Sequence, residues 1–157
     1  MRYFTAIVGV TAMMLTTGCV RTATQEATGD VDVDIESPTK RGEDWHGKML
    51  GKGNWSGLSG DVQALVLEGR TSVTVAITGA QPGAVLPWHI HEGTCETGGE
   101  IVGGHDSYMP MIVGSDGRGS ANAQINVGLD EAKDYFVSFH ASQNEMATIV
   151  ACGDIDD

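Results

Sequence analysis

The sequence of 157 residues has few basic side chains and few large aromatic ones. Lysine and arginine together number 9 against 21 aspartates and glutamates, which gives a formal net charge of −12 at pH 7. Nucleic-acid binding needs clustered Lys and Arg, so this balance argues against it. The balance also argues against electrostatic attachment to an anionic membrane surface. Only 3 phenylalanines accompany 22 glycines, a composition that favours short strands and many turns over long helices.

The N-terminal apolar run, which ends at Leu15, is too short to span a bilayer as a helix. Arg2 precedes it and small residues follow it before Cys19, which is the plan of a signal peptide. The end of this segment resembles a bacterial lipoprotein signal, in which the cysteine becomes the lipid-bearing first residue. Thr16 takes the place where leucine is usual, and an ordinary secretory signal is the alternative. We predict a signal peptide over residues 1–18 and an exported protein held in the cell envelope or periplasm by lipid on Cys19, its one link to the membrane. Removal of the signal peptide would leave a net charge of −13, because residues 1–18 contain one arginine and no acid.

Cysteine is scarce, with Cys19, Cys95 and Cys152 as the complete set. If lipid occupies Cys19, an even pair remains in a compartment where disulfides persist. A bridge between Cys95 and Cys152 would close a loop of about 57 residues, which is worth about 4 kcal/mol in the loop-entropy model.

The segment that follows is polar and has few large apolar groups to bury. We predict a flexible, lipid-anchored tether over residues 19–53, with His46 exposed on it. Its length suits a spacer that lifts a domain off a membrane.

From about residue 55 apolar and polar residues alternate, which indicates half-buried strands. The alternating segments are 62–67, 72–78, 84–91, 121–127 and 135–140, and turn residues separate them. Residues 129–133 hint at one turn of helix. Several short strands with regular turns predict an all-β domain over residues 54–157, with the architecture of an antiparallel sandwich or barrel.

Two histidines stand one residue apart within the strand at 84–91. His89 and His91 therefore share one face, and Trp88 and Ile90 point the other way, into the core. Two imidazoles on one strand face form half of a copper or zinc site. Two further histidines of the domain, His105 on a loop and His140 at the end of a strand, could converge on the same ion. The alternative is a set of unrelated polar residues at strand ends.

Five short motifs occur in a characteristic order along the domain. They are WHIHEGTC at 88–95, GGH at 103–105, VGSDGRGSA at 113–121, VSFH at 137–140 and ACGDI at 151–155. Over about residues 60–155 the chain resembles the copper/zinc superoxide dismutases. The resemblance implies a Greek-key antiparallel barrel and the dismutation of superoxide to oxygen and hydrogen peroxide. It also implies copper ligands at His89, His91, His105 and His140 and a Cys95–Cys152 disulfide.

The departures from this family concern zinc and substrate guidance. Its zinc loop needs two more histidines and an aspartate, whereas His105 is followed by DSYMPM, so we expect copper without zinc. Counted back from Pro110, His105 could instead take a zinc-ligand position, with Tyr108 in the place of the aspartate. The family's long charged loop is largely missing, and Ile149 stands where the substrate-guiding arginine belongs. Arg118 and Lys133 are the remaining candidates for attracting superoxide.

A second function is open to the same fold. Met109 and Met111 stand close to His105 and offer soft thioether ligands for Cu(I), unless both fill the core. On that interpretation the protein is a non-enzymatic copper-binding or copper-buffering lipoprotein. A third interpretation keeps the fold as an interaction domain without a metal.

Overall fold

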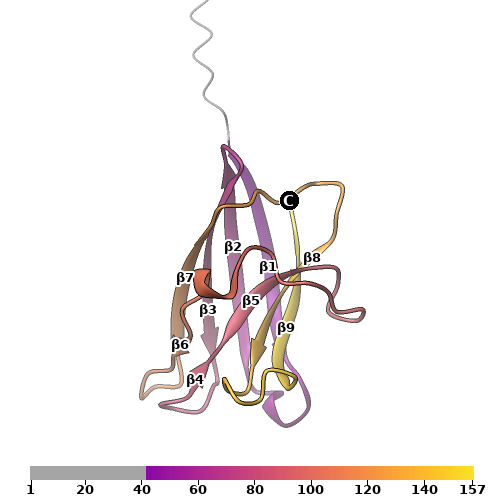
Figure 1. Cartoon of the computed structure of the whole chain (residues 1–157). Coiled ribbons are helices and arrows are strands. Elements are labelled where there is room, and N and C mark those ends of the chain that lie inside the picture. The colour runs from indigo at the N-terminus through magenta and orange to yellow at the C-terminus, as the bar shows by residue number, and fades with distance from the viewer. Residues whose placement is uncertain (1–41) are drawn as a thin grey trace, which may run out of the picture. The chain divides into compact units, whose positions relative to one another are not determined.

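The computed structural model describes residues 42–157, which form an antiparallel all-β domain (Figure 1). The strands are β1 (Glu43–Gly51), β2 (Ser59–Leu67), β3 (Arg70–Thr78), β4 (Val85–Leu86), β5 (Trp88–Glu92), β6 (Met111–Ile112), β7 (Gly119–Ile125), β8 (Tyr135–His140) and β9 (Ile149–Asp156). Two 3-10 helices accompany them, η1 (Gly53–Trp55) and η2 (His105–Ser107). Neither of these helices has the length or apolar character to cross a bilayer. The predicted signal peptide, Cys19 and the first part of the predicted tether lie outside the described residues.

A seven-stranded sheet in the order β5-β8-β9-β1-β2-β3-β7 curls into a half-barrel, and β4 pairs with β6 beside it (Figure 1). The strands β1, β2 and β3 follow one another as hairpins, and β9 returns much later in the chain to lie beside β1. The first and last strands of the domain therefore lie side by side in the middle of the sheet. The predicted all-β barrel or sandwich class is confirmed.

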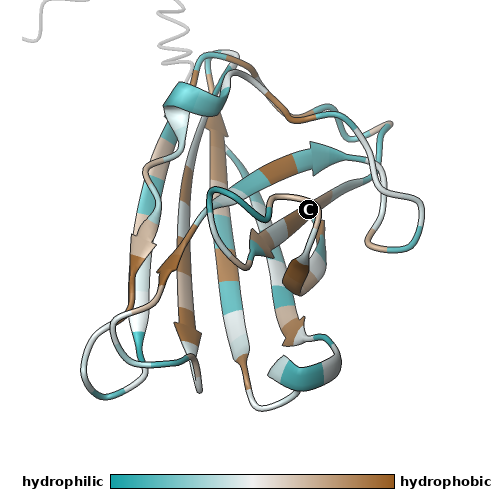
Figure 2. Ribbon diagram, turned by 60° about the horizontal axis from the view of Figure 1, so that its bottom comes forward, coloured by the Kyte–Doolittle hydropathy of each residue, from teal (hydrophilic) through white to brown (hydrophobic). Residues whose placement is uncertain are grey.

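Alternation of apolar and polar residues builds the core. Along β3 every second side chain is buried, from Thr71 to Ile77, and Figure 2 shows apolar and polar residues alternating along the long strands. The strands predicted around 62–67, 72–78, 121–127 and 135–140 are confirmed as β2, β3, β7 and β8. The one predicted at 84–91 is interrupted at Pro87, which cannot donate a ladder hydrogen bond. Residues 129–133 form a hydrogen-bonded turn in place of the suggested helical turn.

The predicted boundary between tether and domain at residue 53 is wrong, because β1 already lies within the sheet. This strand pairs with β2 on one side and with β9 on the other, and its Trp45 and Met49 are fully buried. His46 is exposed, as expected. Gly47 lets β1 approach β9 closely, since a Cβ at this position would stand 2.4 Å from the Asp154 carbonyl oxygen. The folded domain therefore includes at least residues 43–157.

The segment 101–108 bridges the two outer strands of the half-barrel. Ile101 pairs with His91 of β5 at one end, and Tyr108 pairs with Ala123 of β7 at the other. The amide of Val102 also donates a hydrogen bond of 2.9 Å to the Ile90 carbonyl. Figure 1 shows this segment, with the short helix η2, running between β5 and β7. The segment places His105 beside the outer face of β5.

The position of β1 predicts the effect of truncation. A chain that starts at residue 39 should fold, whereas a chain that starts at residue 54 should not, because it loses a central strand with its hydrogen bonds to both neighbours. Circular dichroism and thermal unfolding of the two purified chains measure the difference. A cooperative transition in the chain that starts at residue 54 would contradict the assignment.

Candidate metal centre

The histidine cluster follows from the register between β5 and β8. His89 stands opposite Ser138, and His91 stands opposite Phe136. Because alternate residues of a strand share a face, His89, His91, Ser138 and His140 all lie on one face of the sheet. Trp88 and Ile90 project from the other face and are fully buried in the core, as the sequence predicts.

Three histidines of this face form a group that could hold a metal ion: His89, His91 and His140, whose ligand nitrogens all lie within 4.8 Å of one another. His89 and His140 are buried, and His91 is half-buried. The Nδ1 atom of His89 is 3.4 Å from the Nε2 atom of His140. Imidazole nitrogens bound at about 2.0–2.1 Å to one ion stand about 3–4 Å apart. A small inward movement of the rings would therefore let all three bind a single ion.

In His91 and His89, the ring nitrogen that points away from the group makes a contact that leaves the other nitrogen, with its lone pair, facing the group. The Nδ1 atom of His91 donates to the carbonyl oxygen of Gly99 at 3.0 Å, which leaves its Nε2 as a ligand atom. The Nε2 atom of His89 lies 3.3 Å from Nδ1 of His105. A proton on Nε2 of His89 satisfies this contact and leaves Nδ1 free toward His140. The Nδ1 atom of His140 is buried without a hydrogen bond among the described residues.

Burial keeps these imidazoles neutral. Burial, together with the nearby rings of His140, His105 and His91, lowers the pKa of His89 from 6.5 to about 4. Burial also lowers the pKa of His91 and of His140, although the carbonyls of Gly99 and Met146 act in the opposite direction. A neutral imidazole is the form that binds metal. At pH 7 these three rings therefore need not release an extra proton before they take up an ion.

His105 lies outside the three-histidine group. Its ring is exposed and stands edge-on to His89, on the outer side of that residue. Tyr108, which sequence alignment could place at a zinc-ligand position, is buried and donates its hydroxyl hydrogen to the Val102 carbonyl at 2.7 Å. Burial raises the pKa of this phenol, so Tyr108 serves as a neutral structural residue beside His89.

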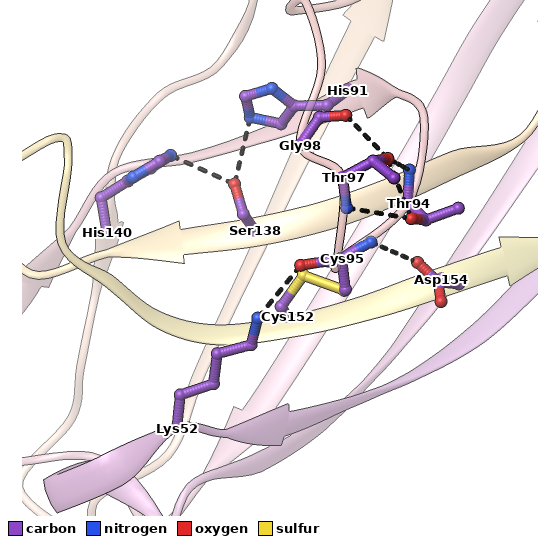
Figure 3. The surroundings of a disulfide bond; sticks show 10 residues. All are labelled: Lys52, His91, Thr94, Cys95, Thr97, Gly98, Ser138, His140, Cys152 and Asp154. Atoms are coloured by element: carbon purple, nitrogen blue, oxygen red, sulfur yellow. Dashed lines mark hydrogen bonds between the residues drawn. A yellow bond between two sulfur atoms is a disulfide. The ribbon is translucent and has the colours of Figure 1, made fainter.

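Ser138 is a component of the site that the sequence analysis missed. Its side chain is fully buried, and its hydroxyl lies 3.1 Å from Nε2 of His91 and 3.2 Å from Nε2 of His140. Figure 3 shows the hydroxyl between the two rings. The alternation of polar and apolar residues placed Ser138 on the face of His140. Its contact with His91 depends on the β5–β8 register, which the sequence does not reveal.

The predicted disulfide between Cys95 and Cys152 is present, with a Cα–Cα distance of 6.0 Å (Figure 3). Asp154 accepts a hydrogen bond of 2.7 Å from the amide of Cys95, and Lys52 donates one of 3.3 Å to the Cys95 carbonyl. These bonds fix the loop after β5 onto β9. The same loop carries Gly99, so the disulfide also supports the carbonyl that orients His91.

The two methionines of the MPM motif have different environments. Met111 is buried in the core and takes no part in the site. Met109 is 72% exposed and lines a cavity on the outer side of His89. Met146, which the sequence analysis did not consider, lines the same cavity.

The sequence matches no known protein-family model, and a search of curated proteins also finds no match. What the chain itself establishes is an all-β domain with a disulfide and a three-histidine group that could hold a metal.

The lowered pKa of His89 predicts a pH-dependent stability of the metal-free protein. The unfolded chain takes up a proton near pH 6.5 and the folded chain only near pH 4, so stability falls as the pH drops through this window. At about 1.4 kcal/mol per pKa unit, His89 contributes roughly 2 kcal/mol of the loss between pH 7.5 and pH 5, and up to roughly 3 kcal/mol once the pH falls below about 4. Urea unfolding at pH 7.5 and pH 5 measures it. His89→Gln should reduce the loss and His46→Gln should not, and an equal loss in all three proteins would contradict this origin.

Ser138 predicts a difference between the metal-free and metal-loaded proteins. Ser138→Ala removes the one hydroxyl proton that lies between the Nε2 atoms of His91 and His140, which costs about 1–3 kcal/mol in the metal-free protein. The cost should shrink after metal loading, because the ion takes up both lone pairs. Thermal unfolding of both forms tests this, with the exposed Ser72→Ala as the matched control. Equal destabilisation of the two forms would show that Ser138 acts only through packing.

Proposed function

We propose that the protein binds copper in the three-histidine group and uses it to disproportionate superoxide to oxygen and hydrogen peroxide. The observation that carries the proposal is the convergence of His89, His91 and His140, from two paired strands, with their ligand nitrogens within 4.8 Å. The antiparallel half-barrel and the Cys95–Cys152 disulfide agree with the motifs that resemble the copper/zinc superoxide dismutases.

The chemistry of the donor set favours copper. All three ligands are imidazoles, which suit copper and zinc, and copper(II) binds most tightly among the divalent first-row metals. The three rings leave room in the coordination shell for a small substrate, since copper takes four or more ligands in such sites. One ligand residue of the group, His89, also lines a cavity of about 370 Å³.

Bound copper would supply one-electron exchange, by which one superoxide is oxidised to oxygen and another, with two protons, is reduced to peroxide. The chain's own residues would hold the ion and deliver protons. His89, His91 and His140 fix its position, and the Gly99 carbonyl keeps the ring of His91 in orientation. His105, exposed at the cavity and in contact with His89, is the residue placed to pass protons from solvent.

The charge distribution favours a second candidate, a copper-binding or copper-buffering protein without enzymatic activity. Superoxide is an anion, and a net charge of −12 repels it unless local positive charge focuses it. Lys133 pairs with Glu92 at 2.8 Å, and Arg118 stands 4.0 Å from Asp116. Among the described residues that line the cavity over His89 there is no lysine or arginine. Dismutation is therefore expected to be slower than in a protein with a guiding arginine.

We further propose that the protein is exported and anchored in the cell envelope through lipid on Cys19. The plan of the N-terminal segment and the disulfide support this location, because disulfides persist outside the reducing cytosol. Copper, superoxide and the membrane lipid are the partners that this proposal includes, and no role for zinc is part of it.

The purified protein tests both candidates. We expect one copper per chain, a Cu(II) EPR spectrum with nitrogen hyperfine structure, and superoxide dismutation that requires added copper. His91→Gln/His140→Gln should lose the copper, the spectrum and the activity, since two of three ligands are gone. His46→Gln is the matched control, because His46 is exposed and far from the cluster in sequence and should leave all three unchanged.

The outcomes separate the candidates. Copper bound without dismutation would favour the buffering protein, and failure of the intact protein to bind copper would contradict both. Circular dichroism of the double variant, which should match that of the intact protein, tests whether a loss comes from the missing ligands or from unfolding.

A further inference from the structure

The cavity on the outer side of His89 has soft ligands at its wall. It encloses about 370 Å³ and is lined by the thioether-bearing Met109 and Met146 together with His89 and His105. Met109 comes from the segment before β6, and Met146 comes from the loop between β8 and β9. Two methionines that are distant in the sequence thus line the same cavity as two histidines.

Met109 is held at this cavity without packing into the core. Its side chain is 72% exposed, whereas Met49 and Met111 are fully buried. Its carbonyl oxygen accepts a hydrogen bond of 3.0 Å from the indole nitrogen of Trp88, which is itself buried under the site. The backbone is therefore fixed, and the flexible thioether can turn into the cavity.

Met146 is carried by a loop that internal hydrogen bonds hold in shape. The amide of Ala141 bonds to the Thr148 carbonyl at 3.0 Å, and the amide of Glu145 bonds to the Ser142 carbonyl at 3.1 Å. Met146 is half-buried and lies against the cavity. The carboxylate of Asp106, which also lines the cavity, gives it a negative charge that attracts cations.

We propose that Met109, Met146 and His105 form a second, outer site for monovalent copper. Thioethers are soft ligands that select Cu(I) over harder ions, and an imidazole completes the set. The three-histidine group, built of imidazoles alone, is the better site for Cu(II). The outer site does not depend on copper binding at the inner one, and the two can be tested separately.

The two sites share one residue as their common wall. Nδ1 of His89 faces His140 in the inner group at 3.4 Å, and Nε2 of His89 faces His105 at 3.3 Å. An ion captured at the thioethers is therefore one imidazole away from the inner ligands. The outer site is positioned to receive Cu(I) from solvent and to pass it to the inner group as Cu(I), a transfer that needs no oxidant.

Silver(I) is the probe for this site, because it is a soft monovalent ion without redox chemistry here. The full chain is used with the Cys95–Cys152 disulfide intact and with Cys19→Ser, since a free thiol would bind silver itself. Carbon-13 NMR of labelled methionine methyl groups should show Met109 and Met146 shifting together and saturating at one equivalent. The signals of Met49 and Met111 should not move.

Variants give the second measurement. Loss of groups that only support a ligand weakens metal affinity about 10- to 100-fold, so Met109→Leu and Met146→Leu should each weaken silver binding at least about tenfold. Met111→Leu, the same change at a buried neighbour, should leave the affinity unchanged. Unmoved Met109 and Met146 signals, or full affinity in the Met109→Leu/Met146→Leu double variant, would overturn the proposal.

The inner group is tested apart from the outer one. In His91→Gln/His140→Gln two of the three inner ligands are removed, and silver should still bind with the same methionine shifts. Loss of silver binding in that variant would place the ion in the inner group and overturn the outer site. A failure of the proposed function would appear differently, as an intact protein that takes up no Cu(II).

Discussion

The register between β5 and β8 is the constraint on which the site depends. Trp88 stands opposite Phe139, and their rings stack with centroids 6.2 Å apart in the core. Because side chains alternate across a sheet, the same register that buries these aromatics places His89 beside Ser138 on the opposite face. A slip of one residue would send the imidazoles into the core and the indole outward. The apolar packing of one face thus fixes the polar chemistry of the other.

Burial on that second face explains the character of the site. Loops cover the histidines, and the lowered pKa of His89, about 4, is the result of this desolvation together with the neighbouring rings. Two of the three rings are oriented by a contact on the side away from the group: the Gly99 carbonyl for His91 and His105 for His89. The disulfide also holds this arrangement in place, since it ties the loop that carries Gly99 to β9.

Much of the fold could be predicted from alternation, and the exceptions have physical causes. The strands β2, β3, β7 and β8 have regular patterns, so they were found. β1 was missed because Gly47 and charged residues dilute its pattern, leaving Trp45 and Met49 as the only large inward side chains. The sequence pattern does not predict β9 either, because a glycine interrupts it. Gly153 lies where β9 approaches β1 closely, and a Cβ there would stand 2.2 Å from the Lys48 carbonyl oxygen.

The site was predictable in part. The strand period placed His89, His91 and His140 on particular faces, and the motifs suggested that they meet. The positions of His105 and Met146 depend on how two loops fold over the sheet, which no local pattern encodes. Ser138 resembled any polar residue of a half-exposed strand, and only the pairing with β5 gives it two imidazole partners.

The segment that carries His105 has a consequence beyond the histidine group. Outermost strands with unpaired backbone groups invite strand addition by neighbouring chains. Here Ile101 pairs with β5 and Tyr108 pairs with β7, so one stretch of chain covers part of each outer edge of the sheet. Neighbouring copies of the domain are thereby hindered from edge-to-edge aggregation, and a substitution that loosens this stretch would reduce solubility as well as disturb the histidines.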